Sequence, residues 1–384
     1  MTGIATPIAV ALTGLKLTDF RNYSSLSLDL AAPLIALTGP NGAGKTNCLE
    51  AISLLTPGRG LRRAPYEALI RDGADNGWAV AADLEREREA VRIGTGLQAL
   101  PEGLERGRRI RINGANASAE NMLEYLRVLW LTPAMDGLFT GPAGDRRRFL
   151  DRLVLAVDPG HGRRVTDLEK LLASRNRLLD ENGEPALLDA IETQLAEKAL
   201  AVAIARAETI GLLTDRIAGQ AADGAGFPLA ALALAGDFEA RYLGGPARMG
   251  EDAYRDALAR TRARDRAAGR TLEGPHRSDL AVVFSDKTMP AAQSSTGEQK
   301  ALLISIILAH ARLLRLDRQA APLLLLDEIV AHLDATRRRA LYDEILALGA
   351  QAWLTGTDPA DFAELGAAAQ FFEVRDATVT AGAS

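Results

Sequence analysis

The chain has 384 residues, of which 47% are hydrophobic and 25% charged, and a formal net charge of -5 at pH 7. This is the composition of a globular, soluble chain of two or three domains. The acidic balance gives no overall sign of nucleic-acid binding, which would need local basic patches. A lone cysteine, Cys48, excludes a disulfide framework, favours a reducing cytosolic compartment and is expected in the core. The longest apolar runs are too short or too polar to cross a bilayer, so no membrane association is expected.

The N-terminal third is expected to be rich in strands. The apolar first residues, 1–17, lack the basic start of a signal peptide and favour a strand. Period-2 alternation predicts half-buried antiparallel strands over 13–30, and residues 33–39 follow as a short buried strand. Helical spacing of apolar residues begins at Lys45. Further short strands are expected between residues 78 and 112.

The middle of the chain differs from both ends. Residues 145 to 270 are rich in Ala, Leu, Arg and Glu with helical periodicity, interrupted by a turn and a possible strand before residue 238. After Gly274 the pattern returns to alternating strands and helices. The strands are expected at 279–286, 322–329, 351–358 and 369–381, with a helix over 298–316. We therefore predict an α/β domain made from residues 1–145 and 273–384, with a helical insertion over 146–272.

The segment GPNGAGKT matches the phosphate-loop pattern G-x-x-x-x-G-K-[ST] and lies between a predicted strand and helix. A chance glycine turn is the alternative, but the context fits the motif. The glycines let backbone N–H groups wrap around phosphate, and the helix adds its positive N-terminus. Lys45 would reach the β- and γ-phosphates and Thr46 would ligate Mg²⁺. The predicted loop consists of Gly39, Pro40, Asn41, Gly42, Ala43, Gly44, Lys45 and Thr46.

The segment LLLLDE, residues 323–328, predicts a buried strand that carries two acids to its C-terminal edge. Asp327 can hold Mg²⁺ there, and Glu328 can orient or deprotonate an attacking water. Alone, the segment could be any strand that ends at a charged turn. With the phosphate loop it predicts a nucleotide site in which Lys45 and Glu328 are the catalytic groups. No N-K-x-D segment supports guanine specificity, so ATP is the predicted nucleotide.

The segment SSTGEQK, residues 294–300, is a polar turn that opens into an apolar helix about 25 residues before the acidic strand. This is the layout of an ABC-type ATPase, in which the signature serine and helix N-terminus face the γ-phosphate bound by a second subunit. Ser295 and Gly297 match the serine and second glycine of the signature, and Thr296 replaces its first glycine. A plain helix N-cap is the alternative for Ser295.

Four further residues flank these motifs. Arg21 and Asn22, in DFRNY, precede the phosphate loop, and either a nucleotide contact or a simple surface turn fits them. Asp334, in AHLDA, resembles the D-loop aspartate of a dimer interface. For the neighbouring His332, interface packing and a catalytic part are equally compatible with the sequence.

The interval of about 250 residues between the phosphate loop and the signature is longer than in transporter ATPases and too short for the coiled coil of SMC proteins. The segments LTDFRNY, GRGLRRA, GDRRRFLDRL, GPHRSDL and STGEQKALLISIILAHARLL together resemble the RecF recombination-mediator family, over essentially the whole chain. The sequence departs from the family at TPAMDGLF, where an acidic residue is common near Met135. Asp136 is the candidate to replace it.

This resemblance implies a cytoplasmic, DNA-binding ATPase of DNA replication and repair, with an ABC-type head and a short helical arm. It implies ATP-driven homodimerisation on single-stranded or gapped DNA, slow DNA-stimulated hydrolysis, recombinase loading with RecO and RecR, and a part in recombination and the SOS response. The resemblance leaves open whether the protein acts as an enzyme. The alternatives are an ATPase subunit of a transporter, which the long insertion disfavours, and a nucleotide-gated structural clamp on DNA.

DNA contacts are expected from arginine clusters, which supply salt-dependent phosphate contacts without sequence specificity. A solvated or salt-bridged surface is the alternative for each cluster. The first choice is Arg59, Arg62 and Arg63. The other candidates are Arg108, Arg109 and Arg111, and the helical run Arg260, Arg262, Arg264 and Arg266.

Overall fold

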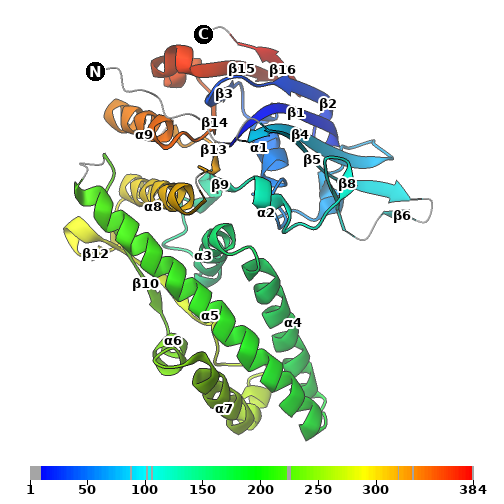
Figure 1. Ribbon diagram of the computed structural model, residues 1–384, viewed down its shortest axis with the longest axis vertical. Helices are drawn as coiled ribbons and strands as arrows, with labels where there is room; N and C mark the ends of the chain where they lie inside the picture. The colour runs from blue at the N-terminus through cyan, green and yellow to red at the C-terminus, as the bar shows by residue number, and fades with distance from the viewer. Residues whose placement is uncertain are drawn as a thin grey trace. The chain divides into compact units, whose positions relative to one another are not determined.

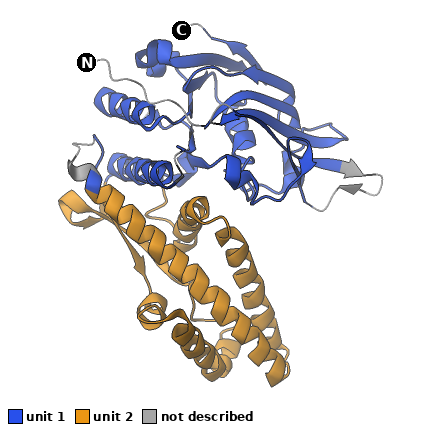
Figure 2. Cartoon of the chain, viewed as in Figure 1, with its two compact units in different colours: residues 1–136, 219–228, 295–384 blue, residues 137–218, 229–294 orange. Residues whose placement is uncertain are grey.

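The computed structural model describes residues 10–86, 89–100, 103–104, 107–222, 226–318, 320–330 and 333–382. Residues 1–9 of the strand expected over 1–17, and His332, therefore lie outside the described residues. The chain divides into two compact units (Figure 2). Unit 1 contains Met1–Asp136, Gly219–Pro228 and Ser295–Ser384, and unit 2 contains Gly137–Ala218 and Leu229–Ser294. The predicted borders at 145/146 and 272/273 stay a proposal, and both fall within unit 2.

Unit 1 contains a sheet whose strands are parallel except at one edge (Figure 1). Its order is β16 (Thr378–Ala381), β15 (Ala369–Arg375), β3 (Leu34–Thr38), β14 (Ala352–Gly356), β13 (Leu323–Leu326) and β9 (Val128–Leu131). Only β16 runs antiparallel to its neighbour. Every residue of β3, β13 and β14 is buried, as expected for strands covered on both faces. The sequence predicts all of these strands except β9.

The second sheet of unit 1 is antiparallel. Its order is β2 (Tyr23–Asp29), β1 (Val10–Phe20), β4 (Gly77–Arg86), β5 (Glu89–Leu100), β7 (Arg109–Ile112) and β8 (Ala115–Asn116), with β6 (Gly103–Leu104) paired to β5. Buried and less buried side chains largely alternate along β2 and β4, so one face packs against the core. The predicted antiparallel pair over 13–30 is confirmed.

Helix α1 (Lys45–Ser53) joins the two sheets, because it contacts both β14 and β4. Its side chains Leu49 and Ile52 belong to one apolar core with residues of both sheets, including Trp353 and Val80. Helices α8 (Thr296–Arg318) and α9 (Ala335–Leu348) lie on the other side of β13 and β14 from α1 (Figure 1). The short helix α2 (Met122–Tyr125) and 3₁₀ turns at Tyr66–Leu69, Pro133–Met135 and Pro359–Ala368 complete the unit.

Unit 2 is mainly helical, as predicted. Its elements are α3 (Ala143–Val157), α4 (His161–Asp180), most of α5 (Pro185–Ala222), α6 (Asp237–Tyr242), α7 (Ala247–Ala267), and a sheet of β10 (Ala230–Ala235), β11 (Asp279–Phe284) and β12 (Met289–Pro290). Short 3₁₀ turns cover Ser285–Lys287 and Ala291–Gln293. Leucines of α4 and α5 pack with Phe238, Tyr242 and Tyr254, whose rings lie 4.8 to 5.3 Å apart.

A buried ion-pair network crosses the helices of unit 2. The guanidinium of Arg175 is fully buried and lies 2.9 Å from a carboxylate oxygen of Glu192 and 2.8 Å from one of Asp265. It also donates to the hydroxyl of Thr271 and to the carbonyl of Leu258. Each buried charge of the network is therefore paired, and three nitrogens of the Arg175 guanidinium donate hydrogen bonds. In the part of the chain that the structure describes, no helix is long and apolar enough to cross a membrane.

Candidate nucleotide site

The phosphate loop connects β3 to α1, and its backbone shape requires glycine. Gly39 has a φ of 147°, and a Cβ there would lie 2.1 Å from the carbonyl oxygen of Val374. Gly44 has a φ of 123°, and a Cβ there would lie 2.6 Å from the hydroxyl of Tyr23. Only glycine fits both the positive φ and the close approach. The phosphate loop predicted from GPNGAGKT is therefore packed closely against neighbouring residues.

Lys45 is the first residue of α1, and its side chain folds back over the loop. Nζ donates to the carbonyls of Gly39 at 2.6 Å and Pro40 at 2.9 Å, and the residue is 4% exposed. Burial lowers the pKa of Lys45, and the nearby carboxylates of Glu328 and Asp327 oppose that shift. An ammonium has three donors and the two carbonyls accept two, so one remains for an anionic ligand. The geometry fits a phosphate.

The acidic end of β13 meets the start of α1. Thr46 Oγ1 donates to Asp327 Oδ1 at 2.9 Å, although the two residues are 281 positions apart. Thr355, at the end of β14, donates to the same Oδ1 at 2.7 Å and accepts the backbone N–H of Glu328 at 2.9 Å. A hydroxyl beside a carboxylate is the oxygen donor set that Mg²⁺ prefers. Glu328 has a φ of 52°, an uncommon conformation that turns its backbone sharply after β13.

Two residues of DFRNY form hydrogen bonds with the phosphate loop. Asn22 donates to the carbonyl of Ala43 at 3.1 Å and accepts from the amide of Asn47 at 2.7 Å. Tyr23 donates to the carbonyl of Gly44 at 3.1 Å. In this structure the side chain of Asn22 is therefore bonded to the loop and to α1. Its predicted nucleotide contact stays a prediction.

Two arginines share one buried carboxylate on α1. Glu50 is fully buried and accepts from Nε and Nη2 of Arg21, both at 2.8 Å, and from Nη1 of Arg62 at 2.9 Å. Arg21 also donates to the carbonyl of Ala68, and Arg62 to the side chain of Asn47 at 2.5 Å. Arg21, predicted to reach nucleotide, and Arg62, predicted to reach DNA, thus bind α1 in this structure.

The other arginines of the predicted DNA patches differ in their surroundings. Arg59 is exposed and makes no hydrogen bond or ion pair with any residue that the structure describes, whereas exposed Arg63 has a partner. Arg108 donates to the carbonyls of Leu54 and Thr56, and burial lowers its pKa. Arg262 forms ion pairs with Asp189 and Glu192 in unit 2, and Arg266 donates to the carbonyl of Leu179. Arg108, Arg262 and Arg266 therefore have structural partners.

The signature segment begins α8 with a capping arrangement. The backbone N–H of Ser295 donates to the carboxylate of Glu298 at 2.9 Å, and the backbone N–H of Glu298 donates back to Ser295 Oγ at 3.4 Å, the reciprocal pattern of a capping box. The N-cap alternative for Ser295 is thus realised, and it is compatible with a contact to a second subunit. A Cβ at Gly297 would meet nothing within 4 Å. The first turn of α8 therefore has open space beside it.

The segments near Met135 and Asp334 are also placed. Asp136, the candidate to replace the family's acidic residue, lies 3.5 Å from Nζ of Lys300 on α8. Asp334 accepts the backbone N–H of Arg337 at 2.9 Å and so caps α9.

Thr355, Glu50 and Asn47 were missed by the sequence analysis. Thr355 had a usable signal, because LTGTD ends a predicted buried strand with polar residues, and parallel strands carry such residues to one edge. Glu50 and Asn47 gave no comparable signal. They lie on an amphipathic helix where a polar residue is expected to be solvated.

Cys48 is fully buried in α1, and its Sγ lies 3.2 Å from the hydroxyl of Tyr23. Burial raises the pKa of the thiol to about 12, and the bond to Tyr23 opposes this rise only in part. Because the thiolate is the reactive form, we expect iodoacetamide to label the folded chain about a thousandfold more slowly than the chain in concentrated guanidinium chloride. Mass spectrometry follows the labelling, with Cys48→Ser as the blank. Comparable rates in the two conditions would contradict the buried placement.

The comparisons of this chain with known proteins agree on one family. The family described as RecF/RecN/SMC N terminal domain matches residues 11–378. The DNA replication and repair protein RecF of Mesorhizobium japonicum is 56% identical over 375 residues, covering 97% of this chain and 98% of that protein. The DNA replication and repair protein RecF of Rhizobium etli is 53% identical over 375 residues, covering 97% and 99%.

Solved structures agree in fold. The recombination mediator protein RecF-ATPrS in the RecFOR pathway matches with a TM-score of 0.85 at 21% identity, covering 99% of this chain and 100% of that one. A Pyrococcus furiosus Smc head domain matches with a TM-score of 0.53 at 16% identity, covering 97% and 96%. An ABC-type head with a helical insertion and a phosphate loop facing an acidic strand end defines the class of SMC-like head proteins. Within that class the chain belongs to the RecF family.

Proposed function

We propose that this chain binds ATP with Mg²⁺ and acts as a DNA-binding recombination mediator in DNA replication and repair. The observation that carries the proposal is the hydrogen bond between Thr46 and Asp327, with Lys45 beside them. It joins the phosphate loop to the acidic strand as a nucleotide-dependent ATPase needs. Relatives above 50% identity over nearly the full length support the biological setting, and a likeness to solved RecF-ATP supports the choice of nucleotide.

The predicted site residues have distinct roles in this proposal. Backbone N–H groups of the loop 39–44 hold the phosphates, and Lys45 contacts the β- and γ-phosphates. Thr46 and Asp327 hold the metal ion, which neutralises charge on the transferring phosphoryl group. Glu328 orients or deprotonates the attacking water. We propose slow, DNA-stimulated hydrolysis, because one chain alone supplies only half of the composite site.

We further propose that ATP joins two copies of the chain. In the dimer, Ser295 and the N-terminus of α8 in one copy face the γ-phosphate held by the other. The open space beside Gly297 and the position of Ser295 at the first turn support this role. Asp334, which caps α9 while staying exposed, is proposed to lie at the same interface. RecO and RecR are the proposed protein partners, with single-stranded or gapped DNA as the substrate surface, and recombinase loading and the SOS response as the setting.

DNA affinity should depend on nucleotide, because each net acidic chain attracts phosphate only through a local patch. Dimerisation brings two patches together, and each added B-DNA phosphate contact steepens the slope of log K against log salt by about 0.9. We expect a steeper slope with a non-hydrolysable ATP analogue than without nucleotide, measured by fluorescence anisotropy on a gapped duplex. Among the proposed contacts Arg59, Arg62 and Arg63, the most informative variant is Arg59→Glu, because the side chain of Arg59 bonds to none of the residues that the structure describes.

The matched control is Arg163→Glu, the same charge change at an exposed position of α4. Arg59→Glu should flatten the slope with nucleotide bound and leave ATP affinity unchanged, whereas Arg163→Glu should leave both unchanged. An identical slope with and without nucleotide would mean that dimerisation does not build the DNA site. High turnover without DNA would favour another class of ATPase, and undetectable turnover would favour the structural clamp.

A further inference from the structure

The segment GPHRSDL, Gly274 to Leu280, carries a motif that the nucleotide site does not use. Its backbone is held firmly within unit 2. The carbonyl of Pro275 accepts from Arg206 Nη1 at 2.6 Å, and the carbonyl of Ser278 accepts from Arg147 Nη1 at 2.8 Å. These two bonds fix the segment on both sides of Arg277.

Most side chains of the segment are also committed. The ring of His276 lies 3.0 Å from the carbonyl of Thr271. Ser278 donates to Glu239 at 2.6 Å, and Asp279 accepts both Nε and Nη2 of Arg146, at 2.8 and 2.7 Å. Arg277 is the exception. It is exposed and makes no side-chain hydrogen bond or ion pair with any residue that the structure describes.

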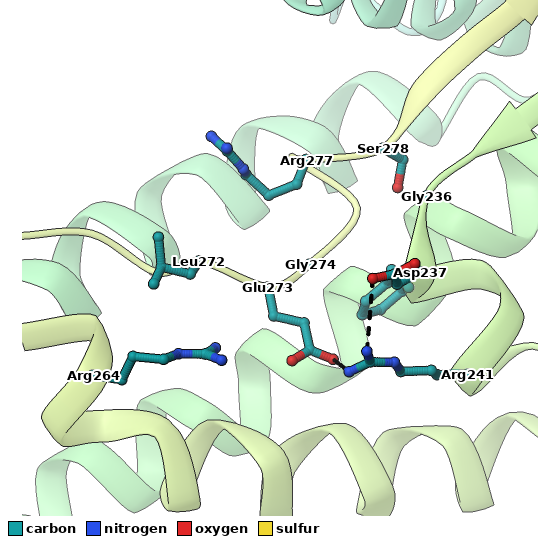
Figure 3. Close-up of a pocket in the computed structure, with 10 residues that line it drawn as sticks. Gly236, Asp237, Arg241, Arg264, Leu272, Glu273, Gly274, Arg277 and Ser278 are labelled. Atoms are coloured by element: carbon teal, nitrogen blue, oxygen red, sulfur yellow. Dashed lines mark hydrogen bonds and ion pairs between the residues drawn. The ribbon is translucent and has the colours of Figure 1, made fainter. Parts of the chain in front are cut away.

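Arg277 lines a cavity of about 450 Å³ within unit 2 (Figure 3). Two further arginines, Arg241 and Arg264, line it together with Glu273 and Asp237. Figure 3 shows Arg241 and Arg264 extending toward Glu273 from opposite sides, whereas Arg277 extends away from it. The apolar side chains in the lining are Phe238 and Leu272.

The arginines that line this cavity differ in how closely a carboxylate pairs with each of them. Arg241 lies 3.2 Å from Glu273 and 3.6 Å from Asp237, so its charge is matched. Arg264 lies 3.7 Å from Asp265, whose buried carboxylate already pairs with Arg175 at 2.8 Å. Arg264 therefore has a shared partner.

Additional positive charge lies close to Arg277. The pKa of His276 is lowered by burial, and the positive charges of Arg277, Arg147 and Arg206 contribute to the same shift. Arg206 is neutralised by Asp151 and Arg147 donates to the carbonyl of Ser278, whereas the side chain of Arg277 bonds to none of the described residues. A fixed backbone, an unmatched guanidinium and an adjoining cavity together favour the binding of an anion here.

We propose that this cavity binds a carboxylate of an acidic peptide segment on a partner protein, with Arg277 as its main anchor and Arg264 as the second. The planar guanidinium of arginine suits bidentate binding of a carboxylate. Leu272 and Phe238 supply the apolar lining for a neighbouring side chain of the peptide.

The lining favours a peptide over nucleic acid. Asp237 is exposed at the cavity, and Glu273 lies inside it, so a phosphodiester backbone with a negative charge at every residue would be repelled at both. A peptide can place one carboxylate at Arg277 and neutral groups elsewhere. The volume also suits one or two side chains rather than a strand of nucleotides.

The test uses the full chain and two fluorescein-labelled hexapeptide pools with amidated C-termini. One pool carries a single Asp or Glu among neutral residues, and the other carries Asn or Gln at that position. We expect the acidic pool to bind about tenfold more tightly in fluorescence polarisation, because one charge-assisted bidentate contact distinguishes the pools. Arg277→Gln should abolish the preference, and Arg277→Lys should restore part of it.

The matched control is Arg260→Gln, an exposed arginine one turn before Arg264 on α7 that does not line the cavity. It should keep the preference, and all variants should retain the same melting temperature. Equal binding of the two pools, or equal loss in Arg260→Gln and Arg277→Gln, would overturn the proposal. A loss of single-stranded DNA binding in Arg277→Gln without a loss of peptide binding would assign the cavity to nucleic acid. Competition by inorganic phosphate as strong as by the acidic peptide would assign it to a free anion.

Discussion

Lys45→Met is expected to weaken ATP binding by about a hundredfold. The ammonium lies at the loop between two carbonyls, where one donor remains for phosphate. Losing a hydrogen bond from a charged group costs about 1.5–3 kcal/mol, and the upper end corresponds to about a hundredfold in affinity. Methionine keeps the length of the apolar stem, so the loop should keep its shape. Isothermal titration with ATP and Mg²⁺ measures the change.

The control is Lys198→Met on α5, whose ammonium pairs with exposed Glu197 instead of a loop carbonyl. It should leave ATP affinity unchanged. Full ATP affinity in Lys45→Met would contradict the assignment of the phosphate loop. A fall in melting temperature without added nucleotide would instead indicate a structural part for the buried ammonium.

Arg175→Ala is expected to lower the free energy of unfolding by about 3–5 kcal/mol, since removing one partner of a buried pair leaves the other charge uncompensated. Among the ion pairs between described residues, Asp265 would keep only the weaker contact at 3.7 Å to Arg264, beside hydrogen bonds from Thr261 and Leu272, whereas Glu192 would keep Arg262. The affected charge is therefore mainly that of Asp265. Urea unfolding followed by circular dichroism measures the loss.

Arg255→Ala is the matched control. Arg255 lies on α7, whereas Arg175 lies on α4, and it pairs with the exposed carboxylates of Asp252 and Asp256. Exposed pairs contribute about 0–1 kcal/mol, so this variant should unfold nearly as the parent does. Similar losses in the two variants would show that burial of the network is not what makes Arg175 important.

The sequence predicted those parts of the site that rest on local patterns. The phosphate loop needs glycines at fixed spacing, and the strand before Asp327 is a continuous apolar run, so both were recognisable. The fold class followed from the return of alternating elements after Gly274. The strand β9 was missed, because the four apolar residues Val128–Leu131 follow a helical pattern and are too few to decide between helix and strand.

Partners set by tertiary structure could not be predicted. Arg62 belonged to a basic sequence cluster, but a buried carboxylate five residues after Lys45 accepts its hydrogen bond. Arg108 similarly meets carbonyls at the end of α1 that are more than fifty residues away in the chain. A run of arginines in the sequence shows where positive charge lies along the chain. The carboxylates and carbonyls that bind these arginines come from distant segments.

Sedimentation velocity with and without ATP tests the central claim of an ATP-joined pair most directly. With Mg²⁺ and ATP, the Glu328→Gln variant should sediment as a species with twice the mass of the 40.9 kDa chain. The variant keeps ATP bound, while its hydrolysis of ATP is slowed. Adding Ser295→Arg should hold the same protein at the monomer mass with ATP affinity unchanged, since the change lies in the half of the site given to the partner. A monomer in saturating ATP without Ser295→Arg, or an undiminished dimer with it, would contradict the account.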